Sequence, residues 1–105
     1  VDFGYIPDCG SMCQMLENTT GKMPVFIGKP KPDMVYKAME KYGFDKDLTA
    51  VIGDRIYTDI PAGVNADVCT ICVLSGEATL KDIDESDIKP DYVFNSVKEV
   101  LEAIK

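Results

Sequence analysis

The segment AVIGDRIYTDI, residues 50–60, joins a short apolar strand to the start of a helix. Its first three residues are apolar, as expected of a strand that helices cover on both faces. Gly53 then lets the backbone bend, and Asp54 follows directly after the strand. In an open α/β sheet, ligands bind outside the carboxyl ends of the strands. The segment therefore predicts a parallel strand that delivers a carboxylate to a ligand site.

The rest of the chain alternates apolar runs with amphipathic stretches around this segment. Strands are predicted at residues 25–27, 50–52, 70–74 and 92–94. Helices are predicted between Asp8 or Ser11 and Gly21, from Pro32 to Gly43, from about Asp59 to Ala66, and after Asn95 or Ser96. A Ser/Gly/Glu-rich loop and one short turn are expected between the last two strands. This order predicts an α/β fold with an open, mostly parallel, Rossmann-like sheet and flanking helices.

Three of the predicted helices carry an apolar face that should point to a core. The residues of these faces are Met12, Met15 and Leu16; Val35, Ala38, Met39 and Tyr42; and Val97, Val100, Leu101 and Ile104.

Length and charge exclude several classes of protein. The 105 residues make one domain at most, and 11 basic against 18 acidic residues give a net charge of −7. Such a charge disfavours nucleic acid or an anionic membrane as a partner. No apolar run approaches the ~20 residues of a membrane span, and no signal peptide is visible. A cytoplasmic location is the default expectation.

The four cysteines are best explained as ordinary buried thiols. Cys9 and Cys13 have the spacing of one helical face, whereas Cys69 and Cys72 lie in an apolar run that would place them on opposite faces of a strand. A zinc site and disulfides are weaker alternatives, because no histidine is present and a cytoplasmic chain is kept reduced.

A lysine and two carboxylates are expected to converge at the carboxyl edge of the sheet. Lys29 lies between Gly28 and Pro30 after the first predicted strand, and its charge could neutralise a phosphate. Asp54 after the second strand suits Mg²⁺, with Asp59 as a second ligand or a hydrogen-bond partner. Arg55 is a weaker candidate for substrate contact. Taken singly, the three charged residues could equally be a loop lysine, a strand-end acid and a helix N-terminal acid.

Several common nucleotide-binding and catalytic motifs are missing from the sequence. The chain contains no G-x-G-x-x-G, no P-loop motif and no histidine, so dinucleotide binding, P-loop chemistry and histidine-based triads have no support. No residue is placed as an activated nucleophile.

Together, the quoted motifs resemble the haloacid dehalogenase (HAD) superfamily, in its NagD-like, p-nitrophenylphosphatase-type branch. Gly28-Lys29-Pro30 is similar to the third motif of that branch, and residues 51–60 are similar to the fourth. Residues 74–76 and 90–93 resemble its later loop and strand. The resemblance implies a phosphatase that hydrolyses phosphate monoesters of small metabolites through an aspartyl-phosphate. Lys29 would stabilise charge, and Asp54 with Asp59 would hold Mg²⁺.

The first motif of that family, Asp-x-Asp-Gly, supplies the nucleophile and the acid/base, and the second supplies a Ser or Thr for phosphate. Neither motif occurs in this sequence. The resemblance therefore implies an incomplete HAD-type core, in which residues 1–10 return from a cap domain and residues 11–105 form the C-terminal half of the core. Such a chain alone is expected to be inactive. The strand at residues 50–53 would lack a neighbour, so self-association there, or pairing with residues 1–10, is expected.

Two alternative functions remain open. A phosphoacceptor receiver domain also clusters acids and a lysine, but its acid pair lies near the first strand and its lysine follows the last. The other alternative is a structural or interaction segment without chemistry of its own.

Overall fold

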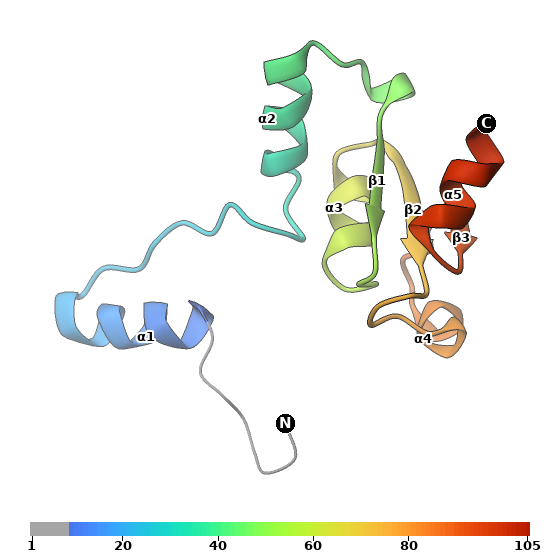
Figure 1. Ribbon diagram of the computed structural model, residues 1–105. Helices are drawn as coiled ribbons and strands as arrows, with labels where there is room; N and C mark the ends of the chain where they lie inside the picture. The colour runs from blue at the N-terminus through green and yellow to red at the C-terminus, as the bar shows by residue number, and fades with distance from the viewer. Residues whose placement is uncertain (1–8) are drawn as a thin grey trace.

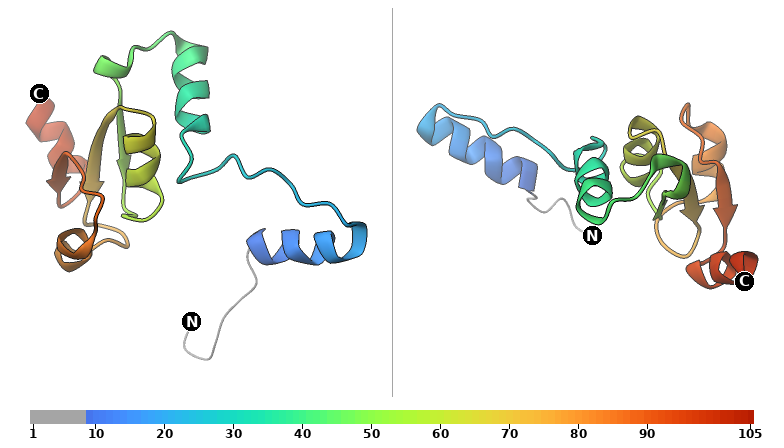
Figure 2. Two further views of the ribbon diagram at one scale, coloured as in Figure 1. Left: turned by 180° about the vertical axis from the view of Figure 1, so that it is seen from behind. Right: turned by 90° about the horizontal axis from the view of Figure 1, so that it is seen from above.

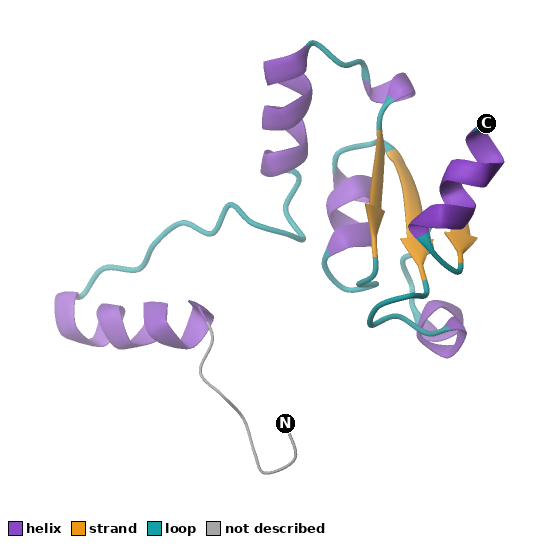
Figure 3. Cartoon of the chain, viewed as in Figure 1, coloured by secondary structure: helices purple, strands orange, loops and turns teal. Residues whose placement is uncertain are grey.

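The apolar runs at residues 50–53, 69–73 and 92–94 form one parallel sheet (Figures 1 and 3). The computed structural model describes residues 9–105. Its elements are α1 (Cys9–Thr20), α2 (Asp33–Tyr42), the 3₁₀ helix η1 (Lys46–Leu48), β1 (Ala50–Gly53), α3 (Asp59–Asn65), β2 (Cys69–Val73), α4 (Leu80–Glu85), β3 (Tyr92–Phe94) and α5 (Val97–Ile104). The predicted α/β class with a parallel sheet and flanking helices is confirmed.

The strands lie in the order β1-β2-β3, so each pairs with its neighbour in the chain. Ala50 pairs with Cys69 and Ile71 pairs with Tyr92 at the starts of the two ladders. The loop before β3 is fixed by Asp91, whose Oδ2 accepts hydrogen bonds from the Thr70 backbone N–H at 2.9 Å and the Thr70 hydroxyl at 3.3 Å. These bonds fix the register of β3 against β2.

Helices α3 and α5 lie on opposite faces of the sheet, as the view from above in Figure 2 shows. Helix α3 packs so tightly that a Cβ on Gly63 would lie 2.4 Å from Cγ2 of Thr70. The core around α3 consists of Ile56, Ile60, Cys72 and Ala78, with Ile83 of α4 packed against them. This core holds the loops after β1 and β2 against each other.

The predicted strand at residues 25–27 is wrong. The segment is extended but has no strand assignment, and Val25, Phe26 and Ile27 are exposed. A strand forms only when a neighbour satisfies its backbone groups. Within residues 9–105 this segment has no such neighbour, and it runs away from the sheet between α1 and α2 (Figure 1).

Helix α4 was not predicted as a helix. Its first turn is stabilised by a capping box, in which the Thr79 hydroxyl accepts from the Asp82 N–H and the Asp82 carboxylate accepts from the Thr79 N–H. Of the two residues predicted to cap α5, Ser96 occupies the N-cap position. Its side chain makes no capping hydrogen bond, and Asn95 instead donates from its backbone and its amide to Glu99.

The apolar helix faces are less buried than predicted. In α5 only Val100 is buried, and Val97, Leu101 and Ile104 are exposed. Helices α1 and α2 bury no residue. Both views in Figure 2 show α1 projecting away from the other elements. Periodicity identified apolar faces correctly, but it could not say which chain segment would cover them.

Strand β1 is an edge strand of the sheet formed by the described residues. The prediction that it is covered on both faces is wrong here, because Ile52 is 44% exposed. A groove of about 420 Å³ lies between α2 and β1, with Val35, Met39 and Val51 in its lining. The predicted pairing of residues 1–10 with this edge falls mostly on residues 1–8, which lie outside the described part. The predicted boundary between residues 10 and 11 stays a prediction.

All four cysteines are free thiols. Cys72 is fully buried, as predicted for an ordinary core thiol, whereas Cys9 is exposed on α1. Residues 9–105 contain no helix with the length and apolar character needed to cross a lipid bilayer.

Candidate active site at the carboxyl ends of β1 and β2

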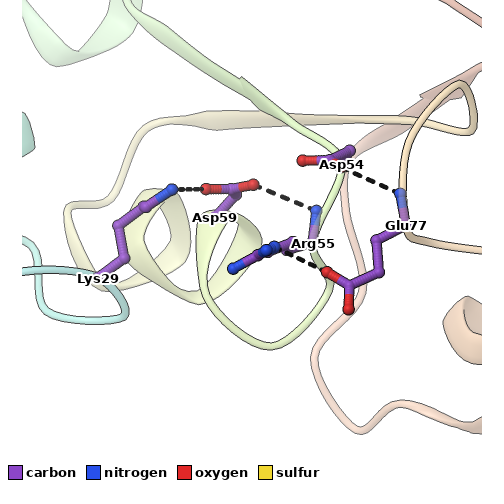
Figure 4. Close-up of polar contacts among 5 residues, drawn as sticks. All are labelled: Lys29, Asp54, Arg55, Asp59 and Glu77. Atoms are coloured by element: carbon purple, nitrogen blue, oxygen red, sulfur yellow. Dashed lines mark hydrogen bonds and ion pairs between the residues drawn. The ribbon is translucent and has the colours of Figure 1, made fainter. Parts of the chain in front are cut away.

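Lys29 and Asp59 form an ion pair at the carboxyl edge of the sheet, beside Asp54 (Figure 4). Lys29 comes from the loop before α2, Asp54 follows β1, and Asp59 begins α3. The structure thus brings together the three residues that the sequence predicted for one site. They lie where ligands bind in open α/β folds.

Asp59 is held from two sides. Its Oδ1 pairs with Nζ of Lys29, and its Oδ2 accepts the backbone N–H of Arg55 at 3.1 Å. Asp59 is only 7% exposed, and a Cβ on Gly53 would lie 2.3 Å from its Cβ. Glycine at position 53 is therefore what lets β1 approach the acid that begins α3.

Asp54 is held by the loop after β2. Its Oδ2 accepts the backbone N–H of Glu77 at 3.0 Å, and its backbone carbonyl accepts the N–H of Ala78 at 2.8 Å. A Cβ on Gly76 would lie 2.0 Å from Oδ2 of Asp54, so only glycine allows this contact. Among residues 9–105 no group donates a hydrogen bond to Oδ1 of Asp54, which leaves that oxygen available to a ligand.

The two carboxylates share a buried neighbour, Cys72. Burial raises the pKa of the Cys72 thiol above its ordinary value, and the charges of Asp54 and Asp59 raise it further. The thiol therefore stays protonated at physiological pH and packs as a small apolar side chain near the two acids.

Arg55 points its guanidinium to Glu77 rather than to the two acids. Its Nε lies 2.7 Å from Oε2 of Glu77, and both side chains are well exposed. The weaker prediction of substrate contact by Arg55 thus has a competing partner in the structure. Gly76 and Glu77 were not predicted as site residues. Their contact with Asp54 depends on the pairing of β1 with β2, which no local sequence signal specifies.

The donor set fits Mg²⁺. Residues 9–105 hold no cluster of three or more histidine, cysteine or acidic side chains that could enclose a metal. Mg²⁺ is usually bound by one or two carboxylates together with phosphate and water oxygens, so a larger protein cage is not needed. Oδ1 of Asp54 is the oxygen best placed to bind it, whereas both oxygens of Asp59 already have partners.

The sequence profile of the HAD-hydrolase-like family matches residues 26–100. This chain belongs to that family. The match includes Lys29, Asp54 and Asp59, so the whole candidate site lies within the HAD region.

Two curated HAD relatives illustrate the similarity. Ribonucleotide monophosphatase NagD of Escherichia coli is 38% identical over 97 residues, which cover 92% of this chain and 39% of the relative. Acid sugar phosphatase of Staphylococcus saprophyticus is 36% identical over 102 residues, which cover 97% of this chain and 39% of the relative. The chain thus spans about two fifths of the length of these relatives.

Solved structures agree with the sequence comparison. The 4-nitrophenylphosphatase of Thermotoga maritima matches with a TM-score of 0.85 and 40% identity, over 100% of this chain and 41% of that chain. The structure of NagD from E. coli matches with a TM-score of 0.81 and 38% identity, over 92% of this chain and 39% of that chain. The HAD phosphatase fold is therefore shared over almost all of the described residues.

Proposed function

We propose that this chain supplies the lysine and the magnesium carboxylates of a phosphatase that hydrolyses phosphate monoesters through an aspartyl-phosphate. The observation that supports this proposal best is the Lys29–Asp59 ion pair beside Asp54 at the carboxyl edge of the sheet. The family match and the phosphatases among the relatives favour the same chemistry over a receiver domain or a purely structural role.

Each of the three residues has a distinct part in the proposed reaction. Lys29 is half exposed, so its ammonium group can reach a bound phosphate while Asp59 holds it in place. Asp54 would bind Mg²⁺ through Oδ1, with Asp59 as a second ligand or as the acid that fixes Lys29. Bound Mg²⁺ would neutralise charge on the phosphoryl oxygens and orient them.

The names of the relatives indicate the expected class of substrate. A small phosphorylated metabolite is expected, since the two relatives are named ribonucleotide monophosphatase and acid sugar phosphatase. The net charge of −7 disfavours a polyanionic substrate such as nucleic acid.

This chain alone is expected to show no turnover. It contains no Asp-x-Asp-Gly sequence, so neither the nucleophile nor the acid/base of the proposed reaction is present. The test compares p-nitrophenyl phosphate hydrolysis with Mg²⁺ by residues 1–105 and by the product of the complete reading frame. Hydrolysis by the complete product alone, dependent on Mg²⁺, is the expected result. Turnover by residues 1–105 themselves would contradict the proposal.

We also propose that the free edge of β1 makes this chain self-associate. Within residues 9–105 no strand pairs with the outer side of β1, which lies next to the apolar groove lined by α2, and such edges recruit further strands.

Light scattering at high concentration should therefore detect dimers or larger species of residues 1–105. Ile52→Lys should shift the population to monomers, because a charge on the edge strand opposes pairing. Leu48→Lys is the matched control, since Leu48 is an exposed apolar residue just outside β1. A monomeric unmodified chain at high concentration would refute this interface.

A further inference from the structure

Arg55 and Glu77 connect the two acids of the site through a continuous series of contacts (Figure 4). The backbone N–H of Arg55 donates to Oδ2 of Asp59, and the backbone N–H of Glu77 donates to Oδ2 of Asp54. The two side chains then meet, with Nε of Arg55 2.7 Å from Oε2 of Glu77. Each residue thus holds one acid with its backbone and the other residue with its side chain.

The pair joins two loops that follow different strands. Arg55 lies after β1 and Glu77 lies after β2. The loop after β2 is pressed against Asp54 at Gly76, where a Cβ would lie 2.0 Å from Oδ2 of that acid. A change in the separation of the two loops would therefore move the N–H groups that orient the two carboxylates.

We infer that Arg55 and Glu77 form a positioning clamp that sets the spacing of the Asp54 and Asp59 oxygens and thereby the affinity of the cation site. This inference rests on the proposed function, since it assigns the clamp to the magnesium carboxylates. The pair is expected to contribute little to the stability of the fold. The side chains of Arg55 and Glu77 are 60% and 67% exposed, and exposed ion pairs contribute little to folding.

For loss of the Arg55 charge, the clamp predicts an effect on cation affinity opposite to that of simple electrostatics. Removing the positive charge of Arg55 should raise the affinity of a nearby cation site if only Coulomb forces act. Loss of the clamp should lower it, because the two carboxylates lose their fixed spacing. Outer-shell partners of metal ligands typically change affinity about 10–100-fold. For this exposed pair we expect Arg55→Gln to weaken Mg²⁺ binding about three- to tenfold.

The experiment uses the product of the complete reading frame and measures Mg²⁺ affinity by calorimetry, repeated with Mn²⁺ by electron paramagnetic resonance. Arg55→Gln, Glu77→Gln and the double variant form a double-mutant cycle. If the two residues act as one unit, the double variant should bind Mg²⁺ no more weakly than the weaker-binding single variant does. Lys31→Gln is the matched control. Lys31 is an exposed lysine near Lys29, and it forms no ion pair within the described residues. It should leave affinity unchanged or slightly raised.

Unchanged or raised Mg²⁺ affinity in Arg55→Gln would overturn the clamp. So would a raised KM for substrate at unchanged Mg²⁺ affinity, which would assign Arg55 to substrate contact. Asp54→Asn separates the two proposals. If it abolishes binding while Arg55→Gln has no effect, only the clamp fails. If the unsubstituted protein binds no Mg²⁺, the proposed function fails, and the clamp fails with it. Equal thermal unfolding midpoints confirm that the variants are folded.

Discussion

Asp54→Asn is expected to remove Mg²⁺ binding and to lower phosphatase turnover about a thousandfold in the product of the complete reading frame. The substitution keeps the shape of the side chain but replaces a carboxylate oxygen with an amide and removes its charge. Metal stabilisation of a phosphoryl group is worth several kcal/mol, and each 1.4 kcal/mol changes a rate about tenfold. Oδ1 of Asp54 accepts no hydrogen bond from residues 9–105, so no structural contact of that oxygen is lost.

The measurements are Mg²⁺ titration by calorimetry and p-nitrophenyl phosphate hydrolysis. Asp47→Asn is the control, because Asp47 is an exposed acid in η1, before the opposite end of β1. It removes the same charge without touching the site, and it should bind Mg²⁺ as the unsubstituted protein does. Normal turnover by Asp54→Asn would exclude Asp54 as the metal ligand.

Gly53→Ala is expected to destabilise the fold by about 1–3 kcal/mol and to disrupt the site at the same time. The added methyl group would lie 2.3 Å from Cβ and 2.5 Å from Cγ and Oδ2 of Asp59. Asp59 cannot turn away freely, since it is 7% exposed, begins α3 and is held by Lys29 and Arg55. Either β1 and α3 separate or the ion pair with Lys29 breaks.

Urea unfolding and p-nitrophenyl phosphate hydrolysis of the complete product test this substitution. Gly28→Ala is a matched control, because a Cβ on Gly28 would meet no atom within 4 Å, although Gly28 also adjoins a site residue. It should change the unfolding midpoint little. Gly53→Ala could instead have the same unfolding midpoint and the same activity as the unsubstituted protein. That result would show that neither stability nor activity depends on the close approach of β1 to α3.

The sequence predicted that Asp54 and Asp59 meet at one edge, because Asp54 follows an apolar strand and Asp59 begins the next helix. Lys29 lies beside Asp59 although the strand predicted before it does not form. The loop that contains Glu77 also follows an apolar run at this edge, but its contact with Asp54 could not be predicted, since that contact arises from the pairing of two strands. Helix α4 could have been predicted, because Thr79 and Asp82 have the spacing of a capping box.

The failures of prediction concern what covers an apolar segment. Residues 25–27 have the composition of a strand, but a strand also needs a partner, and none lies beside them among residues 9–105. The apolar face of α5 was identified from its period, yet only Val100 is buried. Local pattern specifies which face is apolar, whereas burial depends on long-range contacts.

The strand order β1-β2-β3 has a consequence for biosynthesis. Each parallel ladder joins strands that are consecutive in the chain, separated by α3 in one case and by α4 in the other. The pairing of β1 with β2, and of β2 with β3, does not require a segment from much later in the chain. The sheet can therefore form in the order in which the ribosome releases the strands. Both Asp54 and the loop that holds it are complete once Ala78 has emerged, before β3 is added.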